Sequence, residues 1–132
     1  MLLLNGKTKN CSKKRYDSPR RRLLEAKFPG EVSQDESIIQ KFVCASKDNI
    51  LVQGELYVTN KCCYFYSALN SKLMFGKNGT RIILPFSNIA SVKKQNALIV
   101  FPSTIKFLMK NGKEYSFTSF LSRDTCYILI VH

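Results

Sequence analysis

The residues best suited to chemistry in this chain are cations set beside apolar side chains. One stretch, in a predicted loop over residues 68–80 and just after it, combines three cations with three adjacent apolar residues: Lys72, Leu73, Met74, Phe75, Lys77 and Arg81. Apolar side chains of this kind can enter the headgroup region of a bilayer while the cations hold phosphates. Folding of Leu73 and Phe75 back onto the protein as a short helix explains the same pattern, so both interpretations stay open.

A second group of cations lies near the N-terminus. Residues 1–30 hold nine basic and two acidic residues, out of a net charge of +12 for the chain. Its two clusters are Lys13, Lys14, Arg15 and Arg20, Arg21, Arg22. They bracket Ser18-Pro19, a candidate phosphorylation site where added negative charge would weaken attraction to an anionic surface. Because sustained periodicity is missing, we predict a flexible basic arm over residues 1–27, with a short helical turn at 21–27.

This charge distribution predicts an anionic partner but does not indicate which class of anion is bound. A basic arm on a mildly basic domain suits nucleic acid, an acidic protein or an anionic lipid surface. A solubilising tail without a partner is an equally good interpretation of the arm alone.

Cysteine and histidine usage argues against catalysis and metal binding. The five cysteines include no C-x-x-C spacing, which favours a reduced, cytosolic chain. The single histidine, His132, is the last residue, so paired zinc ligands and Cys–His or Ser–His pairs are not expected. We therefore expect a protein that is not an enzyme and uses no metal and no cofactor.

The remaining pattern is that of one mainly β domain. The length of 132 residues suits a single core, and apolar residues alternate along Ile50–Thr59 as in a half-buried strand. The seven predicted strands cover residues 39–45, 50–59, 61–67, 81–85, 89–94, 104–109 and 114–119. A helix is predicted over 122–131, a type I′ hairpin at Asn111-Gly112 and a capping-box turn at Ser33 and Glu36. We expect an antiparallel barrel or sandwich whose open end the helix closes.

Two further features are assigned to packing. A stripe of aromatic residues could stack bases, but no RNA-binding motif accompanies Tyr57, Tyr64, Phe65 and Tyr66. Arg123 and Asp124 predict a local helix cap with an ion pair.

Several motifs, in order along the chain, resemble the GRAM domain. They are Phe28-Pro29, Glu36, Cys44, Gly54–Thr59, Cys63–Ser67, Ile83–Phe86, Ile89, Lys93-Lys94 and Tyr115–Asp124, with Tyr127 after them. Within that family they are most similar to the domains of endoplasmic-reticulum-anchored contact-site proteins, including the Aster/Lam sterol transporters. We find no counterpart of the transmembrane anchor and sterol-transfer domain of those proteins in this sequence, and the chain stops about two and a half turns into the predicted helix, so we expect a fragment or short isoform.

The resemblance implies a fold and a function. The fold is a pleckstrin-homology-like barrel of seven antiparallel strands with a C-terminal helix, over residues 28–132. The function is binding of phosphoinositides or phosphatidylserine at the cytosolic face of a membrane, usually the plasma membrane at contacts with the endoplasmic reticulum. A protein-interaction module and nucleic-acid binding through the arm are the alternatives.

The resemblance also implies where lipid binds. In such barrels the first, third and sixth inter-strand loops gather at one open end, so the cations there would share a rim. Of Lys93 and Lys94, adjacent on a strand, at most one can face a given ligand. The predicted lipid-binding residues are Lys47, Lys72, Leu73, Met74, Phe75, Lys77, Arg81, Lys93, Lys94, Lys110 and Lys113.

Overall fold

A computed structural model describes residues 18–47, 51–69, 75–97, 101–120 and 122–131. Within these residues the helices are α2 (Pro19–Lys27) and α3 (Arg123–Val131). The strands are β1 (Ile38–Lys47), β2 (Leu51–Thr59), β3 (Cys62–Leu69), β4 (Phe75–Pro85), β5 (Ile89–Ala97), β6 (Phe101–Met109) and β7 (Glu114–Thr118). A single 3-10 turn, η1 (Phe86–Asn88), joins β4 to β5.

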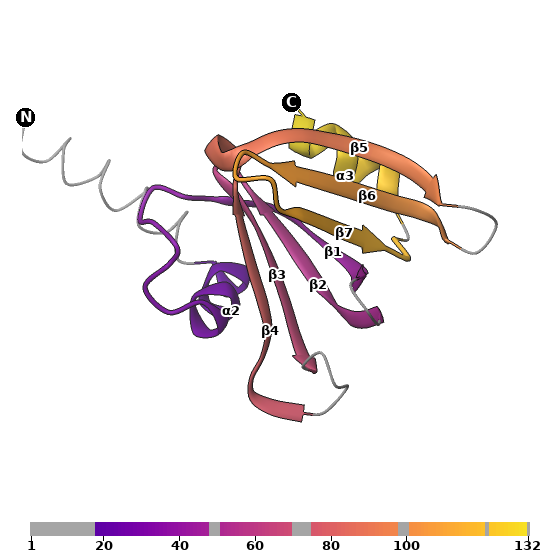
Figure 1. Cartoon of the computed structure of the whole chain (residues 1–132). Coiled ribbons are helices and arrows are strands. Elements are labelled where there is room, and N and C mark those ends of the chain that lie inside the picture. Colours follow the sequence, from indigo (N-terminus) through magenta and orange to yellow (C-terminus); the bar gives the residue numbers. More distant parts are fainter. Residues whose placement is uncertain (1–17, 48–50, 70–74, 98–100, 121, 132) are drawn as a thin grey trace, which may run out of the picture.

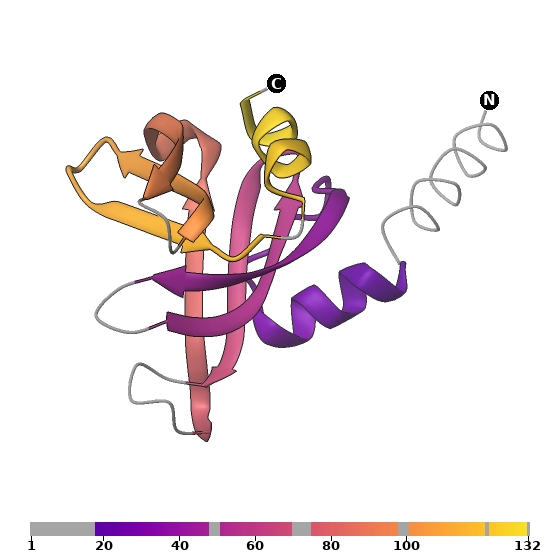
Figure 2. The ribbon, with the colours of Figure 1, turned by 90° about the vertical axis from the view of Figure 1, so that its right-hand side faces the viewer.

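The strands form one antiparallel sheet in the order β4-β3-β2-β1-β7-β6-β5. Figure 1 shows that this sheet bends between β1 and β7, so that β5–β7 cross over β1–β4. The helix α3 lies at the opening between the two halves (Figures 1 and 2). The predicted fold class, seven antiparallel strands with a C-terminal helix, is confirmed.

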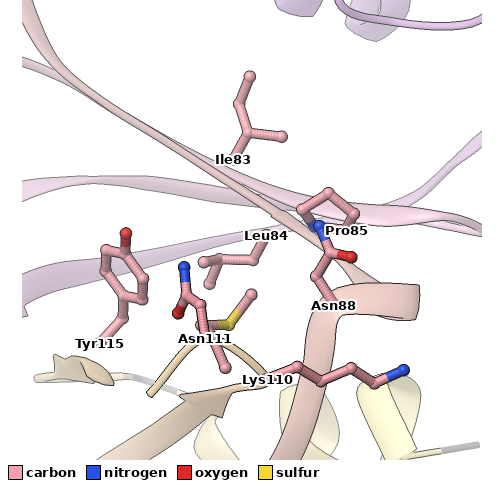
Figure 3. A pocket seen from close by; sticks show the side chains of 8 residues that line it. Ile83, Leu84, Pro85, Asn88, Lys110, Asn111 and Tyr115 are labelled. Atoms are coloured by element: carbon pink, nitrogen blue, oxygen red, sulfur yellow. The ribbon is translucent and has the colours of Figure 1, made fainter. Parts of the chain in front are cut away.

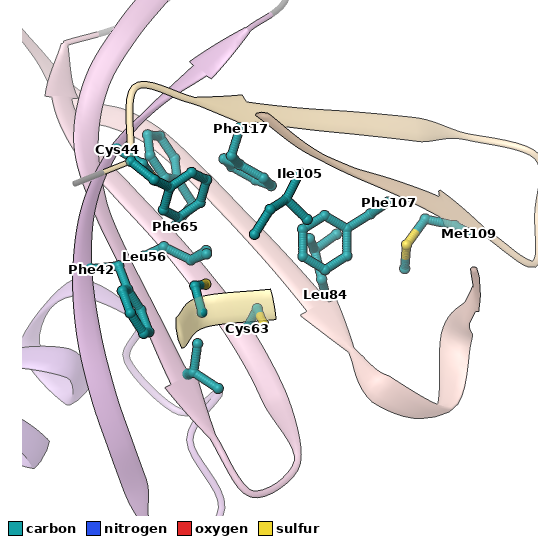
Figure 4. Packing of buried hydrophobic residues seen from close by; sticks show 13 residues of the cluster. Phe42, Cys44, Leu56, Cys63, Phe65, Leu84, Ile105, Phe107, Met109 and Phe117 are labelled. Atoms are coloured by element: carbon teal, nitrogen blue, oxygen red, sulfur yellow. The ribbon is translucent and has the colours of Figure 1, made fainter. Parts of the chain in front are cut away.

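The main core lies between the two halves of the sheet and beneath α3. Phe65, Phe107 and Phe117 meet at its centre (Figure 4). The Phe117 ring centroid lies 5.2 Å from that of Phe65 and 5.6 Å from that of Phe107. Cys126 of α3 is fully buried against this cluster. Burial of a large apolar side chain such as phenylalanine contributes about 1.5–3 kcal/mol. Because Cys126 packs against the same cluster, α3 completes the core.

The helix α2 replaces part of the predicted arm. Ser18 caps it, because its hydroxyl accepts a hydrogen bond from the Arg21 amide at 3.2 Å, and Pro19 suits the first turn. Leu24 and the residue after the helix, Phe28, are buried against Tyr57 and Tyr64 on the outer face of β2 and β3. Residues 19–27 thus form an ordered helix on the sheet, whereas the sequence predicted only a helical turn at 21–27.

This second cluster explains the aromatic stripe. Tyr57 and Tyr64 are buried beneath α2, and the Phe28 and Tyr64 rings lie 5.2 Å apart. Phe65 points the other way, into the main core. The packing interpretation of the stripe is therefore confirmed.

The turn formed by residues 33–36 joins α2 to the sheet. Glu36 accepts hydrogen bonds from the Ser33 amide at 3.1 Å and the Tyr64 hydroxyl at 2.9 Å, and from the Thr59 hydroxyl. The Arg21 guanidinium donates to the Glu36 carbonyl and, at 2.7 Å, to the Ser33 carbonyl. Only half of the predicted capping box is present, because the Glu36 amide donates to the Ser33 carbonyl at 3.1 Å and not to the Ser33 hydroxyl. These bonds close a turn, and no helix follows.

Two predicted connections differ from the structure. The strand β3 extends to Leu69 and β4 begins at Phe75, so the predicted loop over 68–80 is largely strand. The β6–β7 turn is not of type I′, which needs positive φ at both central residues. Here only Gly112 has positive φ (90°), and its amide donates to the Met109 carbonyl at 3.0 Å, as in a type I turn followed by a glycine bulge.

Among the described residues, neither helix has the length and apolar character needed to cross a membrane.

The Glu36 network generates a stability prediction. Glu36→Ala removes one acceptor shared by the Tyr64 and Thr59 hydroxyls in a buried site, so we expect the free energy of unfolding to fall by about 2–3 kcal/mol. Urea denaturation followed by far-UV circular dichroism measures this change. The exposed Glu31→Ala variant is the control and should change stability by less than about 0.5 kcal/mol; equal effects of the two variants would contradict the role of Glu36.

Candidate functional site

Three lysines lie in one cross-strand row. Lys47 of β1 is paired with Ser116 of β7. Ser116 is paired with Lys106 of β6, and Lys106 is paired with Lys93 of β5. Paired residues project from the same face of a sheet, and four neighbouring strands at this spacing span about 15 Å. We call this set, Lys47, Lys93 and Lys106, the lysine row.

The lysine row lies on the outer face of the sheet. The neighbouring residues Ile105, Phe107 and Phe117 point into the main core, so the row residues point away from it. Figure 2 shows α3 and α2 on one side of β5–β7, with the opposite face of these strands clear of both helices. Lys47 and Lys93 are exposed, and the Lys106 side chain is 31% exposed.

The charges of the row repel one another. Lys93 and Lys106 are directly opposite on adjacent antiparallel strands, an arrangement that destabilises a sheet. The Glu114 carboxylate lies 3.0 Å from the Lys106 ammonium and is 52% exposed, so it offsets this repulsion only in part. A bound anion beside Lys93 would relieve its repulsion with Lys106.

Lys94 faces the opposite way, as the strand periodicity predicted. Its ammonium lies 3.6 Å from the Asp124 carboxylate and 5.1 Å above the Tyr127 ring, so it helps to hold α3. Arg123 also pairs with Asp124, at 3.3 Å, which confirms the predicted ion pair. Of the two adjacent lysines, only Lys93 belongs to the row.

The cations near α2 are engaged with the protein. The Lys27 ammonium lies 4.7 Å from the Tyr66 ring centroid and 3.3 Å from the Glu55 carboxylate. The Arg81 guanidinium donates to the Lys27 carbonyl at 3.0 Å, where a helix C-terminus attracts cations. Arg81, predicted as a lipid contact, is thus placed at the end of α2.

The Lys27–Glu55 contact perturbs both groups. Burial alone would lower the pKa of Lys27, but hydrogen bonds with Tyr57 and Glu55 raise it. Burial alone would raise the pKa of Glu55, but hydrogen bonds from Lys41 and Lys27 lower it. Both groups therefore stay charged near neutral pH, and their contact holds α2 in place.

Lys110 and Lys113 lie at the other end of β4 from the β3–β4 hairpin. The Lys110 amide donates to the Asn88 carbonyl at 2.8 Å, which fixes the β6–β7 turn against the β4–β5 corner. A pocket of about 330 Å³ lies between the β6–β7 turn and the β4–β5 corner (Figure 3). It is lined by Leu84, Pro85, Met109 and neighbouring side chains. In Figure 3 the Lys110 amine points away from Tyr115. The expected single rim with the hairpin loop is therefore not formed by these two lysines.

The sequence of this chain is similar to those of known proteins. The sequence profile of the GRAM domain matches residues 22–132. The chain belongs to the GRAM domain family. It is 41% identical over 96 residues to the protein VASCULAR ASSOCIATED DEATH 1, chloroplastic, of Arabidopsis thaliana, and these residues are 73% of this chain. It is 30% identical over 109 residues, or 83% of this chain, to mouse protein Aster-A.

This GRAM domain spans only 15% of the Arabidopsis protein and 14% of Aster-A. In structure it is similar to the crystal structure of the DH/PH domains of p115-RhoGEF, with a TM-score of 0.55 and 10% identity. That match covers 91% of this chain and 38% of the other, and it shows the fold alone. GRAM domains are lipid-binding and interaction modules, so membership supports a membrane-related role in general terms.

The structure brings together part of the predicted site. Lys47 and Lys93 of this GRAM domain join Lys106, which the sequence did not single out; knowing the β5–β6 register would have revealed it. Arg20 and Arg22 are exposed on α2, whereas Arg21 is buried in the Glu36 network. Phe75 and Lys77 are in β4, with side chains outside the described set. Predicted residues that lie outside the described residues are Lys13, Lys14, Arg15, Lys72, Leu73 and Met74.

Most substitutions lower the free energy of unfolding, whereas one that removes the repulsion between Lys93 and Lys106 should raise it. Lys93→Glu places a carboxylate opposite Lys106, so we expect the free energy of unfolding to rise by about 0.2–1 kcal/mol. Urea denaturation at low salt measures the gain, which should shrink as salt is added. Lys110→Glu, an exposed turn substitution without an opposing lysine, should give no such gain. Loss of stability in Lys93→Glu would contradict the repulsion.

Proposed function

We propose that this GRAM domain binds anionic membrane lipids and so targets its parent protein to the cytosolic face of a membrane. The observation that carries the proposal is the lysine row, with Lys93 directly opposite Lys106 on an exposed face. A fold retains a repulsive pair more readily when the same charges bind an anion. The family's association with membranes and lipids supports a lipid as that anion.

The expected binding energy is modest and spread over several groups. A cation near an anionic leaflet contributes about 1 kcal/mol, and this attraction falls away within the Debye length. The three lysines of the row would thus contribute about 3 kcal/mol before the effect of the Glu114 carboxylate beside Lys106, which lowers this sum. The cations predicted from sequence in the 72–77 segment and the arm would add to this, which implies strong salt dependence.

The finer assignments follow from the family likeness. Phosphatidylserine and phosphoinositides are the proposed headgroups. The similarity to Aster-A supports a role at contacts between the endoplasmic reticulum and the plasma membrane when the domain is part of a longer protein. The domain itself would be cytoplasmic and peripheral to the bilayer.

Vesicle co-sedimentation tests the proposal. We compare the full chain with a Lys93→Glu, Lys106→Glu double variant on neutral vesicles and on vesicles containing phosphatidylserine or a phosphoinositide. Loss of two row cations should weaken binding to the anionic vesicles by about thirtyfold, from about 2 kcal/mol. Neutral vesicles should bind neither protein.

An Arg20→Glu, Arg22→Glu variant is the matched control, because it changes net charge equally on the exposed side of α2. It should lose less than the row variant; equal losses would mean that binding depends on net charge alone. A Lys72→Glu, Lys77→Glu variant measures the share of the segment predicted from sequence. Absence of binding to every anionic vesicle would contradict the proposal and favour a protein partner or, through the arm, nucleic acid.

A further inference from the structure

Two exposed leucines share the face of the lysine row. Leu51 of β2 is paired with Lys47, and it is 37% exposed. Leu108 of β6 lies two residues beyond Lys106, hence on the same face, and it is 36% exposed. The outer face therefore combines a row of cations with apolar side chains beside it, which is the composition of a surface that lies in a membrane interface.

The position of the row restricts how a planar partner can reach it. Its lysines come from β1, β6 and β5, at the middle or end of each strand, and two of them, Lys93 and Lys106, lie well within their strands. A leaflet that touched only the tip of the β3–β4 hairpin would not meet these two residues, because the hairpin belongs to the other half of the sheet (Figure 1). A leaflet parallel to the outer face of β5–β7 would meet Lys93 and Lys106 together, and it would reach Lys47 because Lys47 is paired with Ser116 of β7 across the bend.

Resting on the proposed function, we propose that the domain docks face-on: the outer face of β5–β7 and the end of β1 lies flat on an anionic leaflet. Lys47, Lys93 and Lys106 contact headgroup phosphates and carboxylates along the row. Leu51 and Leu108 enter the headgroup layer beside them. The helices α2 and α3, on the other side of β5–β7, face away from the leaflet (Figure 2).

Face-on docking also defines the class of lipid that is bound. Cations spread along about 15 Å do not converge on one phosphate. They match several neighbouring headgroups, each with a single negative charge, better than one multiply phosphorylated headgroup. Long lysine side chains can reach such headgroups independently while their stems cover apolar surface. Binding should therefore follow the surface density of negative charge, with phosphatidylserine as effective as a phosphoinositide at equal charge.

The chain contains no tryptophan, so one introduced tryptophan reports on its own position. We compare Leu51→Trp and Leu108→Trp with Leu23→Trp on α2 and Ile128→Trp on α3, whose native side chains are 55% and 54% exposed. Each variant is mixed with phosphatidylserine vesicles that contain bromine-labelled acyl chains. Sedimentation with the same vesicles is measured in parallel, and urea denaturation confirms that each variant is folded.

Face-on docking predicts that emission from Leu51→Trp and Leu108→Trp falls roughly twofold on vesicle binding, as for a side chain at the headgroup boundary. Emission from the α2 and α3 variants should be unchanged. If all four proteins sediment but only a helix variant is quenched, or none is, the docking orientation is wrong while lipid binding stands. If none sediments, the proposed function itself fails. If phosphoinositide vesicles bind far better than phosphatidylserine vesicles of equal charge, the inferred lipid class is wrong.

Discussion

Glu36 makes the interactions on which the arrangement of this domain depends, through its buried carboxylate and its main-chain carbonyl. It accepts hydrogen bonds from β2 and β3 through Thr59 and Tyr64, while Arg21 attaches α2 to the same turn. This fixes α2 over the aromatic face of β2–β4, where Leu24 and Phe28 fill the second apolar cluster. With that face covered and α3 closing the main core, the outer face of β5–β7 is left for solvent or a partner.

Two lysines on the outer face of β5–β7 lower the stability of the sheet. Lys93 lies directly opposite Lys106 and repels it, and the exposed Glu114 carboxylate offsets this repulsion only in part. Several cations elsewhere in the described region stabilise the fold: Lys94 holds α3, Lys27 and Arg81 hold the end of α2, and Arg21 is buried. The position of Lys93 directly opposite Lys106 on an exposed face is the physical basis of the proposed lipid binding.

Much of the fold follows from patterns that are local in the sequence. Alternation along β2 and the turn residues between strands identified seven strands and the closing helix, because periodicity reports directly on burial. The helix α2 was harder to predict, since its apolar face consists of little more than Leu24 and the following Phe28, and tertiary contacts supply most of its stability. The form of the Gly112 turn depended on the φ of its neighbours, which Asn-Gly alone does not determine.

The site was only partly accessible from sequence for a related reason. Lys47 and Lys93 were predicted from residue type and position in the sequence. Lys106 could be assigned to the site only from the β5–β6 register, which pairs it with Lys93. The predicted rim assumed that Lys110 and Lys113 meet the β3–β4 hairpin. Instead, the bond from Lys110 to Asn88 places their turn at the β4–β5 corner.

The most direct test is nuclear magnetic resonance of the isotope-labelled chain on anionic bilayer discs that carry a paramagnetic lipid. The amide signals of residues 91–95, 104–108 and 114–118 should broaden, while those of residues 19–27 in α2 keep their intensity. Broadening confined to residues 70–77 or to α2, with β5–β7 unaffected, would contradict the account.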